Sequence, residues 1–206
     1  MFTHTGILHR VFFPSLLWRM PGKKIYLTFD DGPHLTATNA ILSILQKYSV
    51  RATFFISGKN IAGNEAIVQR IANEGHSIGI HAYNHTRMLA FSKEQTKNEI
   101  VQTKNLLSAL TTQKIRLFRP PFGFFSWNTI SAARELGFVL TMWSCLTGDY
   151  RKWKNEKIVQ TTLRDISHGS ILVFHDNDLT KDKIAEVLET VIIEIQKRGF
   201  TFGAIR

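Results

Sequence analysis

Short apolar runs alternate with longer amphipathic runs along almost the whole chain. Apolar runs of about four to eight residues are typical of buried strands, and apolar positions three and four residues apart indicate helices with one buried face. The pattern predicts seven strands: Lys24–Asp30, Ala52–Ser57, Ser77–His81, Leu117–Pro121, Phe138–Ser144, Ser170–Asp176 and Phe200–Ile205. Between them it predicts six helices: Thr36–Tyr48, Ile61–Asn73, Ser92–Leu110, Ser126–Leu136, Asn155–Ser167 and Lys181–Arg198.

Local signals support several helix ends. Ser92 with Gln95 forms a capping-box pattern, and Gly75, Gly137 and Gly199 stand where helices should stop. Regular alternation of strand and helix predicts parallel strands joined by helical crossovers. An open doubly wound sheet and a closed barrel with fewer than eight strands both satisfy this pattern. In either architecture the active site is expected at the C-terminal ends of the strands.

The composition is that of one globular domain: 206 residues, 44% hydrophobic and 20% charged. The net charge of +10 favours an anionic partner. The basic residues are scattered and no nucleic-acid-binding motif accompanies them, so nucleic acid is not expected, whereas weak association with an anionic envelope or membrane surface stays open. Cys145 is the only cysteine, which excludes an intramolecular disulfide and a thiolate zinc knuckle.

Residues 1–23 form a separate segment before the first predicted strand. The segment is apolar in patches, but Arg10, Pro14 and Arg19 interrupt it, so it is a poor signal peptide and too short and charged to span a membrane. We expect it to be an N-terminal extension that caps a domain of residues 24–206. Cytoplasmic residence is the default expectation, and association with the cell envelope is the alternative.

Two clusters of polar residues follow predicted strands and could together bind a metal. Asp30 and Asp31 end the first strand, where strand alternation would point them in different directions. His81 and His85 follow the third strand, and their spacing would bring both imidazoles to one face of a helical turn. Taken alone, the two aspartates are more often a polar turn with a capping Asp, and the spacing of the two histidines is as often a coincidence. Asp31 with the two histidines is a ligand set that leaves positions open for water and substrate; zinc suits it, and iron(II), cobalt or nickel fits it too.

Two further clusters end later strands. Arg119 opens an Arg-Pro-Pro-Phe stretch at the end of the fourth predicted strand, where it could pair with a carboxylate or simply lie in a rigid turn. His175 closes an apolar strand and is followed by Asp176. Such a histidine could be a satisfied core residue, a third metal ligand or an acid catalyst.

The motifs TFDDGP, H-x-x-x-H, R-P-P-F and the strand-ending H-D occur in this order at 28–33, 81–85, 119–122 and 175–176. Together they resemble the polysaccharide deacetylase family, the carbohydrate esterases with the NodB homology domain. The resemblance extends from Lys24 to the end of the chain. It implies a distorted seven-stranded (β/α) barrel, one divalent metal ion and an N-acetylated carbohydrate substrate such as peptidoglycan or a chitooligosaccharide.

The resemblance also implies a role for individual residues. Asp30 matches the general base, and Arg119 matches the arginine that pairs with it. His175 matches the general acid, and Phe122 matches the aromatic position whose backbone N–H helps to hold the oxyanion. The metal ligands are matched by three residues: Asp31, His81 and His85.

One motif departs from the family pattern. The family usually has W-x-x-D-x-x-D-W where this chain has Trp143 to Tyr150, so that Leu146 replaces the first Asp and Tyr150 the second aromatic residue. Asp149 is kept at the position that pairs with the acidic histidine. Val173 stands where a leucine commonly lines the acetyl pocket. We expect substrate contacts from Trp143, Tyr150 and Val173, together with Phe122.

Several functions remain open within this interpretation. N-deacetylation of an amino-sugar glycan is the main expectation. O-deacetylation, as on xylan, and deformylation of a lipid-linked amino sugar are alternatives of the same class. A catalytically silent sugar-binding relative and an iron oxygenase are alternatives of other classes, but the oxygenase gives no role to Asp30 or His175.

Overall fold

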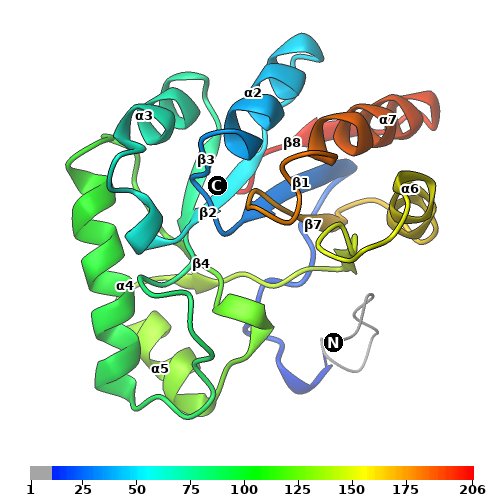
Figure 1. The fold of residues 1–206 in the computed structure, drawn as a ribbon. Helices are drawn as coiled ribbons and strands as arrows, with labels where there is room; N and C mark the ends of the chain where they lie inside the picture. The colour runs from blue at the N-terminus through cyan, green and yellow to red at the C-terminus, as the bar shows by residue number, and fades with distance from the viewer. Residues whose placement is uncertain (1–10) are drawn as a thin grey trace.

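The computed structural model describes residues 11–206, and its centre is one curved parallel sheet. The strands are β1 (Lys24–Asp30), β2 (Thr53–Ile56), β3 (Ser77–Ile80), β4 (Leu117–Phe118), β5 (Val139–Leu140), β6 (Cys145–Leu146), β7 (Ile171–His175) and β8 (Thr201–Gly203). Every pairing between them is parallel. The helices lie outside the sheet (Figure 1) and are α2 (Ala37–Lys47), α3 (Glu65–Asn73), α4 (Lys93–Ser108), α5 (Trp127–Glu135), α6 (Asn155–Leu163) and α7 (Ile184–Lys197).

The strand order distinguishes the two architectures that the periodicity left open. The order is β5-β4-β3-β2-β1-β7-β6, with β8 also paired to β1. Read as a circle, this order is sequential and its gap falls between β5 and β6, as in an opened barrel. A doubly wound sheet would instead reverse its order at a central switch point. The structure therefore confirms the predicted distorted barrel.

The predicted strand Phe138–Ser144 is wrong. Only Val139–Leu140 forms β5, and β6 begins beyond the predicted end, at Cys145. The carbonyls of Thr141 and Met142 accept hydrogen bonds from the Arg119 guanidinium, and the Met142 N–H donates to Leu17 O. These groups cannot also pair with a neighbouring strand, so the segment crosses the gap in the barrel as irregular chain and the predicted strand ends at Leu140.

The helix ends agree with the local signals. Ser92 and Gln95 form both hydrogen bonds of the capping box at the start of α4. Gly75, Gly137 and Gly199 follow α3, α5 and α7 with φ of 78°, 74° and 77°, a conformation that glycine adopts without strain. Within the described residues no helix is long and apolar enough to cross a membrane.

Part of the N-terminal extension packs against the barrel. Leu16 and Trp18 are buried, and backbone bonds of 2.9 Å join Leu17 N to Leu140 O and Met20 N to Gly169 O. The segment therefore lies beside the gap between the two ends of the sheet. Residues 1–10 lie outside the described residues, and a capping role for the extension as a whole stays a prediction.

Strand β1 shows how the fold positions the chemistry. Thr28 and Asp30 both accept hydrogen bonds from Arg119, so they share one face of the strand. Phe29, between them, points the other way and stacks on Phe54 and Phe174 with ring centroids 5.0 and 5.9 Å apart. Alternation along β1 thus gives the strand one polar face, which meets Arg119, and one aromatic face, which packs in the layer of Phe29, Phe54 and Phe174.

Candidate active site

The candidate site is a cavity of about 250 Å³ at the C-terminal ends of the strands. Of the eleven predicted site residues, all but Arg119 and Asp149 line it. These two lie behind Asp30 and His175 and bond to them. Its lining consists of Asp30, Asp31, His81, His85, Phe122, Gly123, Trp143, Leu146, Tyr150, Val173, His175, Asn177 and Leu179.

Asp31, His81 and His85 form one compact donor group. One ligand atom from each lies within 4.8 Å of the other two. Asp31 Oδ1 is 2.7 Å from His85 Nε2 and 3.5 Å from His81 Nε2. Burial alone would raise the pKa of Asp31, but its hydrogen bonds to His81 and His85 and the nearby positive charge of His175 lower it well below the ordinary range.

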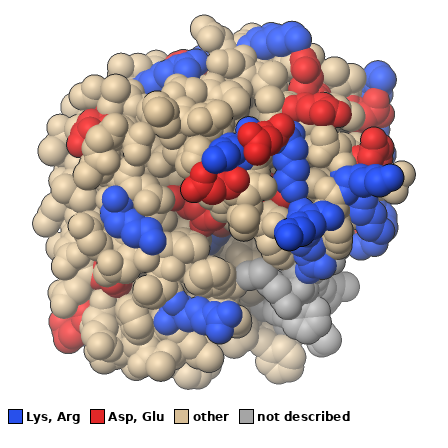
Figure 2. All heavy atoms as spheres, viewed as in Figure 1, with Lys and Arg blue, Asp and Glu red and all other residues tan. Residues whose placement is uncertain are grey.

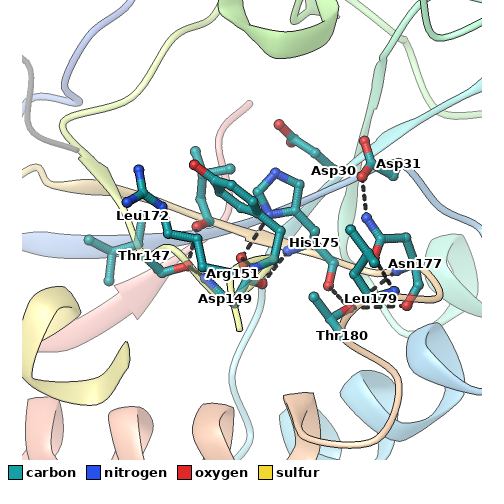
Figure 3. A network of polar contacts seen from close by, with 12 residues as sticks. Asp30, Asp31, Thr147, Asp149, Arg151, Leu172, His175, Asn177, Leu179 and Thr180 are labelled. Carbon is teal, nitrogen blue, oxygen red and sulfur yellow. Dashed lines mark hydrogen bonds and ion pairs between the residues drawn. The ribbon is translucent and has the colours of Figure 1, made fainter. Parts of the chain in front are cut away.

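The surroundings of these donors fit a divalent cation. His81 Nδ1 donates to Arg119 O at 2.7 Å, so that a neutral His81 ring carries its lone pair on Nε2, the nitrogen 3.5 Å from Asp31 Oδ1. Asn177 Nδ2 donates to Asp31 Oδ2 at 2.6 Å, so that Oδ1 is the carboxylate oxygen turned to the histidines (Figure 3). Two neutral imidazoles and one carboxylate oxygen match the donor types of zinc and of iron(II), cobalt or nickel.

The backbone that carries these ligands is not the helical turn that the spacing of His81 and His85 predicted. Residues 81–85 form an irregular loop in which Ala82 and His85 have φ of 61° and 55°. Glu99, from the middle of α4, accepts hydrogen bonds of 2.8 Å from the N–H groups of Tyr83 and Asn84. The two imidazoles converge because this carboxylate holds the loop, and not because of helical periodicity.

Asp30 and Asp31 have different partners, as predicted, although the backbone leaves the strand conformation at Asp31, where φ is 87°. Asp30 Oδ1 accepts a hydrogen bond of 2.6 Å from Arg119 Nη1, and Asp30 Oδ2 lies 4.0 Å from His81 Nε2. Asp30 therefore borders the donor group while its own charge is balanced by the arginine.

The Arg119 guanidinium is fully buried and bonded at every nitrogen. Besides Asp30, it donates to Thr28 Oγ1, Thr141 O and Met142 O, and it lies 4.0 Å over the ring of Phe55. Burial lowers the pKa of Arg119, while the Asp30 charge opposes that change. The charge-assisted bond from this donor pairs the buried Asp30 carboxylate with a fixed positive charge.

His175 ends β7 next to Asp30 in the sheet register. Asp149 binds it twice: Oδ1 to His175 Nδ1 at 2.8 Å and Oδ2 to the His175 backbone N–H at 2.7 Å. In Figure 3, Asp149 lies on one side of His175 and Asp30 and Asp31 on the other. Burial alone would lower the pKa of His175, but Asp149, with smaller contributions from Asp31 and Asp30, raises it to about 10. The imidazole is therefore protonated at neutral pH.

The remaining predicted residues give the cavity apolar walls. Trp143 and Val173 are buried, and Leu146 pairs with Val173 in the β6–β7 register. The Tyr150 ring meets His175 edge-on at 5.1 Å, and the Phe122 ring lies 4.8 Å from that of His85. Within the described residues no hydrogen bond uses the Phe122 N–H, at a residue with φ of 58°.

Sequence reasoning missed the residues that hold the loop carrying Asp31. Asn60 Nδ2 donates to Asp31 O at 2.7 Å, and Asp176 accepts from Gly32 N and Thr38 Oγ1 at 2.9 and 2.5 Å. A Cβ at Gly32 would collide with the Asp176 carboxylate. Asp176 belongs to the H-D motif at 175–176, so the sequence could have indicated its role. For Asn60 and Asn177 the only indication in the sequence is that each follows a predicted strand.

Comparisons with known proteins agree with this geometry. The family model described as polysaccharide deacetylase matches residues 19–141. A peptidoglycan-N-acetylglucosamine deacetylase of Bacillus cereus is 33% identical over 193 residues, which cover 91% of this chain and 90% of that protein.

Two solved structures extend the comparison. A peptidoglycan N-acetylglucosamine deacetylase in complex with 4-naphthalen-1-yl-N-oxidanyl-benzamide superposes with a TM-score of 0.88 at 31% identity, covering 93% of this chain and 91% of that one. A CE4 family pseudoenzyme from Bacillus anthracis has a TM-score of 0.83 at 28% identity and covers 91% of this chain and 66% of its own. The matched family sequence and these folds show that the chain belongs to the polysaccharide deacetylase family.

Proposed function

We propose that this chain is a metal-dependent hydrolase that removes N-acetyl groups from an amino-sugar glycan, with peptidoglycan as the substrate class. One observation carries the proposal: Asp30, paired with Arg119, and His175, paired with Asp149, flank the Asp31–His81–His85 donor group in one cavity. The peptidoglycan deacetylases among the relatives support the choice of substrate.

Asp30 and His175 carry out different proton transfers in the proposed reaction. A divalent cation held by Asp31, His81 and His85 would polarise the acetyl carbonyl and lower the pKa of bound water. Asp30 takes the proton of the attacking water, because its bond to Arg119 holds the carboxylate beside the donor group. The Phe122 N–H stabilises the oxyanion, a contribution of about 3 kcal/mol for one such donor.

His175 completes the reaction by protonating the leaving nitrogen. An amine is a poor leaving group until it is protonated, so an acid is required. Asp149 is a positioning residue, since it holds the imidazole and its charge without lining the cavity. The apolar walls formed by Trp143, Val173 and Leu146 suit the methyl group of an acetyl substituent.

The catalytically silent alternative has a structural precedent in the Bacillus anthracis pseudoenzyme. This chain retains both flanking groups and all three donors in one cavity, and that argues for catalysis.

A substrate in the cell wall would place the protein at the cell envelope and not in the cytoplasm. On the face shown in Figure 2, basic and acidic side chains both gather on the right, over α6 and α7, so an anionic surface would meet mixed charge there.

Acetate release tests the proposal. Purified protein loaded with zinc should release acetate from N-acetylated peptidoglycan fragments or chitooligosaccharides and retain about one equivalent of metal. Release from acetylxylan alone would identify an O-acetyl esterase, and release of formate from an N-formylated sugar a deformylase. A protein that binds metal and glycan but releases no product would be the silent relative.

Asp149→Asn is expected to move the alkaline limb of kcat/KM to lower pH by about one unit or more. His175 must be protonated to act as the acid, and Asp149 is the main group that raises the pKa of His175 to about 10. The rate should be measured from neutral to alkaline pH on an N-acetylated sugar and on an aryl acetate. The loss should be smaller on the aryl acetate, whose leaving group needs no acid.

Stability gives an independent measurement on the same pair. The pKa of His175 is higher in the folded chain than its ordinary value of 6.5, so the pair stabilises the fold fully below pH 6.5 and progressively less as pH rises through about 10. The difference in unfolding free energy between the wild type and Asp149→Asn should shrink over that range. An unmoved limb with equal losses on both substrates would show that Asp149 does not tune His175.

A further inference from the structure

Residues 148–153 form a compact turn that joins the Asp149–His175 pair to the edge of the cavity. Asp149 binds His175, and Tyr150 lines the cavity. Arg151 N donates to Gly148 O at 3.0 Å, which closes the turn. The Trp153 ring packs on Gly148, where an added Cβ would lie 2.6 Å from the indole, so only glycine admits this ring. The turn is therefore built around Trp153 as well as around Asp149.

Two cationic side chains lie over the Trp153 ring, and a third lies nearby. The Arg151 guanidinium lies 4.6 Å over the Trp153 ring and 5.7 Å over that of Tyr150, and Lys157 Nζ lies 5.8 Å over Trp153. Lys183 Nζ, at the start of α7, donates to Arg151 O at 2.7 Å. We call Arg151, Lys157 and Lys183 the cationic rim.

No described carboxylate forms an ion pair with the three cations of the rim. Among residues 11–206 no carboxylate lies within 4.0 Å of the charged nitrogens of these three side chains. Glu186, in the first turn of α7, instead accepts a hydrogen bond of 2.9 Å from Asn155 Nδ2. Asp149 is occupied by His175. A cluster of cations next to a substrate cavity attracts an anionic group on the substrate.

The position of the rim limits where that anion can be. Arg151 reaches His175 only through Tyr150: the guanidinium is 5.7 Å from the Tyr150 ring, which is 5.1 Å from the His175 ring. Figure 3 shows Arg151 on the opposite side of His175 from Asp30 and Asp31. The anion therefore lies away from the reacting amide, on another substituent of the same sugar or on the next sugar.

We infer that the cationic rim is a subsite for a carboxylate of the glycan, so that the substrate is an amino-sugar polymer with acidic sugars, the chemical class of muramic acid. The inference rests on the proposed function and names its substrate class more closely. The Arg151 guanidinium lies 4.6 Å over the Trp153 ring, and its planar set of N–H groups matches the two oxygens of a carboxylate.

The test compares two ligands that differ only in charge: an oligosaccharide containing N-acetylmuramic acid with free carboxylates, and the same oligosaccharide with those carboxylates reduced to alcohols. Binding is measured by calorimetry with the full-length Asp30→Asn protein, which should not turn the ligand over. The acidic ligand should bind about 10-fold more tightly, equivalent to about 1.4 kcal/mol. Added salt should reduce this preference, because exposed charges are screened.

Arg151→Gln in the same background should remove most of the preference by weakening only the acidic ligand. The matched control is Arg134→Gln, which makes the same change of charge in the last turn of α5, away from the cavity, and should leave the preference intact. Equal affinity for the two ligands, or an equal loss for both in Arg151→Gln, would overturn the inference.

Acetate release by the unmutated protein from the same ligands separates this inference from the proposed function. Hydrolysis of both ligands with equal affinity refutes the subsite and leaves the deacetylase. Preferential binding of the acidic ligand without hydrolysis upholds the subsite and refutes the enzyme. Neither binding nor hydrolysis refutes both.

Discussion

His81→Ala and His85→Ala should each reduce the bound metal from about one equivalent to none and acetate release to background. Either change leaves two donors where three now converge within 4.8 Å, and Asp31 loses a partner on which its lowered pKa depends. The fold should persist, because both histidines lie on a loop beyond the end of β3 and the aromatic layer around Phe29 is untouched. Metal analysis of dialysed protein and acetate release measure the two effects.

Thermal unfolding adds a readout that does not depend on activity. A ligand that binds only the folded chain raises its stability, so added zinc should raise the Tm of the wild type and leave that of both variants unchanged. His168→Ala is the matched control. His168 is exposed, and its Nδ1 donates to Lys23 O before the start of β7, far from the donor group. The variant should keep the metal, the activity and the response to zinc. Full metal occupancy in both His81→Ala and His85→Ala would refute the ligand assignment.

Asp30→Asn should keep the metal and lose at least about 100-fold in kcat, the usual contribution of a general base. Asp30 borders the donor group without belonging to it, since its Oδ1 is bonded to Arg119 and its Oδ2 lies 4.0 Å from His81 Nε2. Asparagine preserves the shape of the side chain but cannot take a proton from water. Metal content and kcat are measured on the same preparation.

Two further variants separate the roles of the neighbouring groups. Asp31→Asn should lose the metal, and the opposite result, with metal lost in Asp30→Asn and kept in Asp31→Asn, would exchange the two assignments. Asp30→Asn also leaves the buried Arg119 without its counter-charge, which lowers stability. Thr28→Val removes a different Arg119 bond, of 2.8 Å, and keeps the base, so it should lose stability while its folded fraction keeps kcat.

The sequence by itself determined the order of the elements and the position of the chemistry along them. Apolar periodicity placed β1, β3, β4 and β7, and each candidate cluster stood at the end of one of them. Because parallel strands bring all their C-terminal ends to one edge, residues as far apart as Asp30 and His175 could be predicted to meet. In the sheet they are direct register partners.

Only the tertiary structure decided what depends on hydrogen bonds between distant segments. Arg119 takes the carbonyls that would have continued a strand through Thr141 and Met142. Glu99 holds the loop that carries His81 and His85. The sequence of its helix alone does not distinguish Glu99 from a solvent-exposed glutamate.

The cationic rim belongs to the same category. In the sequence Arg151 is one basic residue among the 26 that are scattered along the chain. Its ring contacts with Tyr150 and Trp153 form within the turn at 148–153, and Lys183 reaches this turn only because α7 packs beside it. Periodicity reports which face of a segment is buried, whereas the partner of a polar group is fixed by the packing of whole elements, and a local pattern does not contain that information.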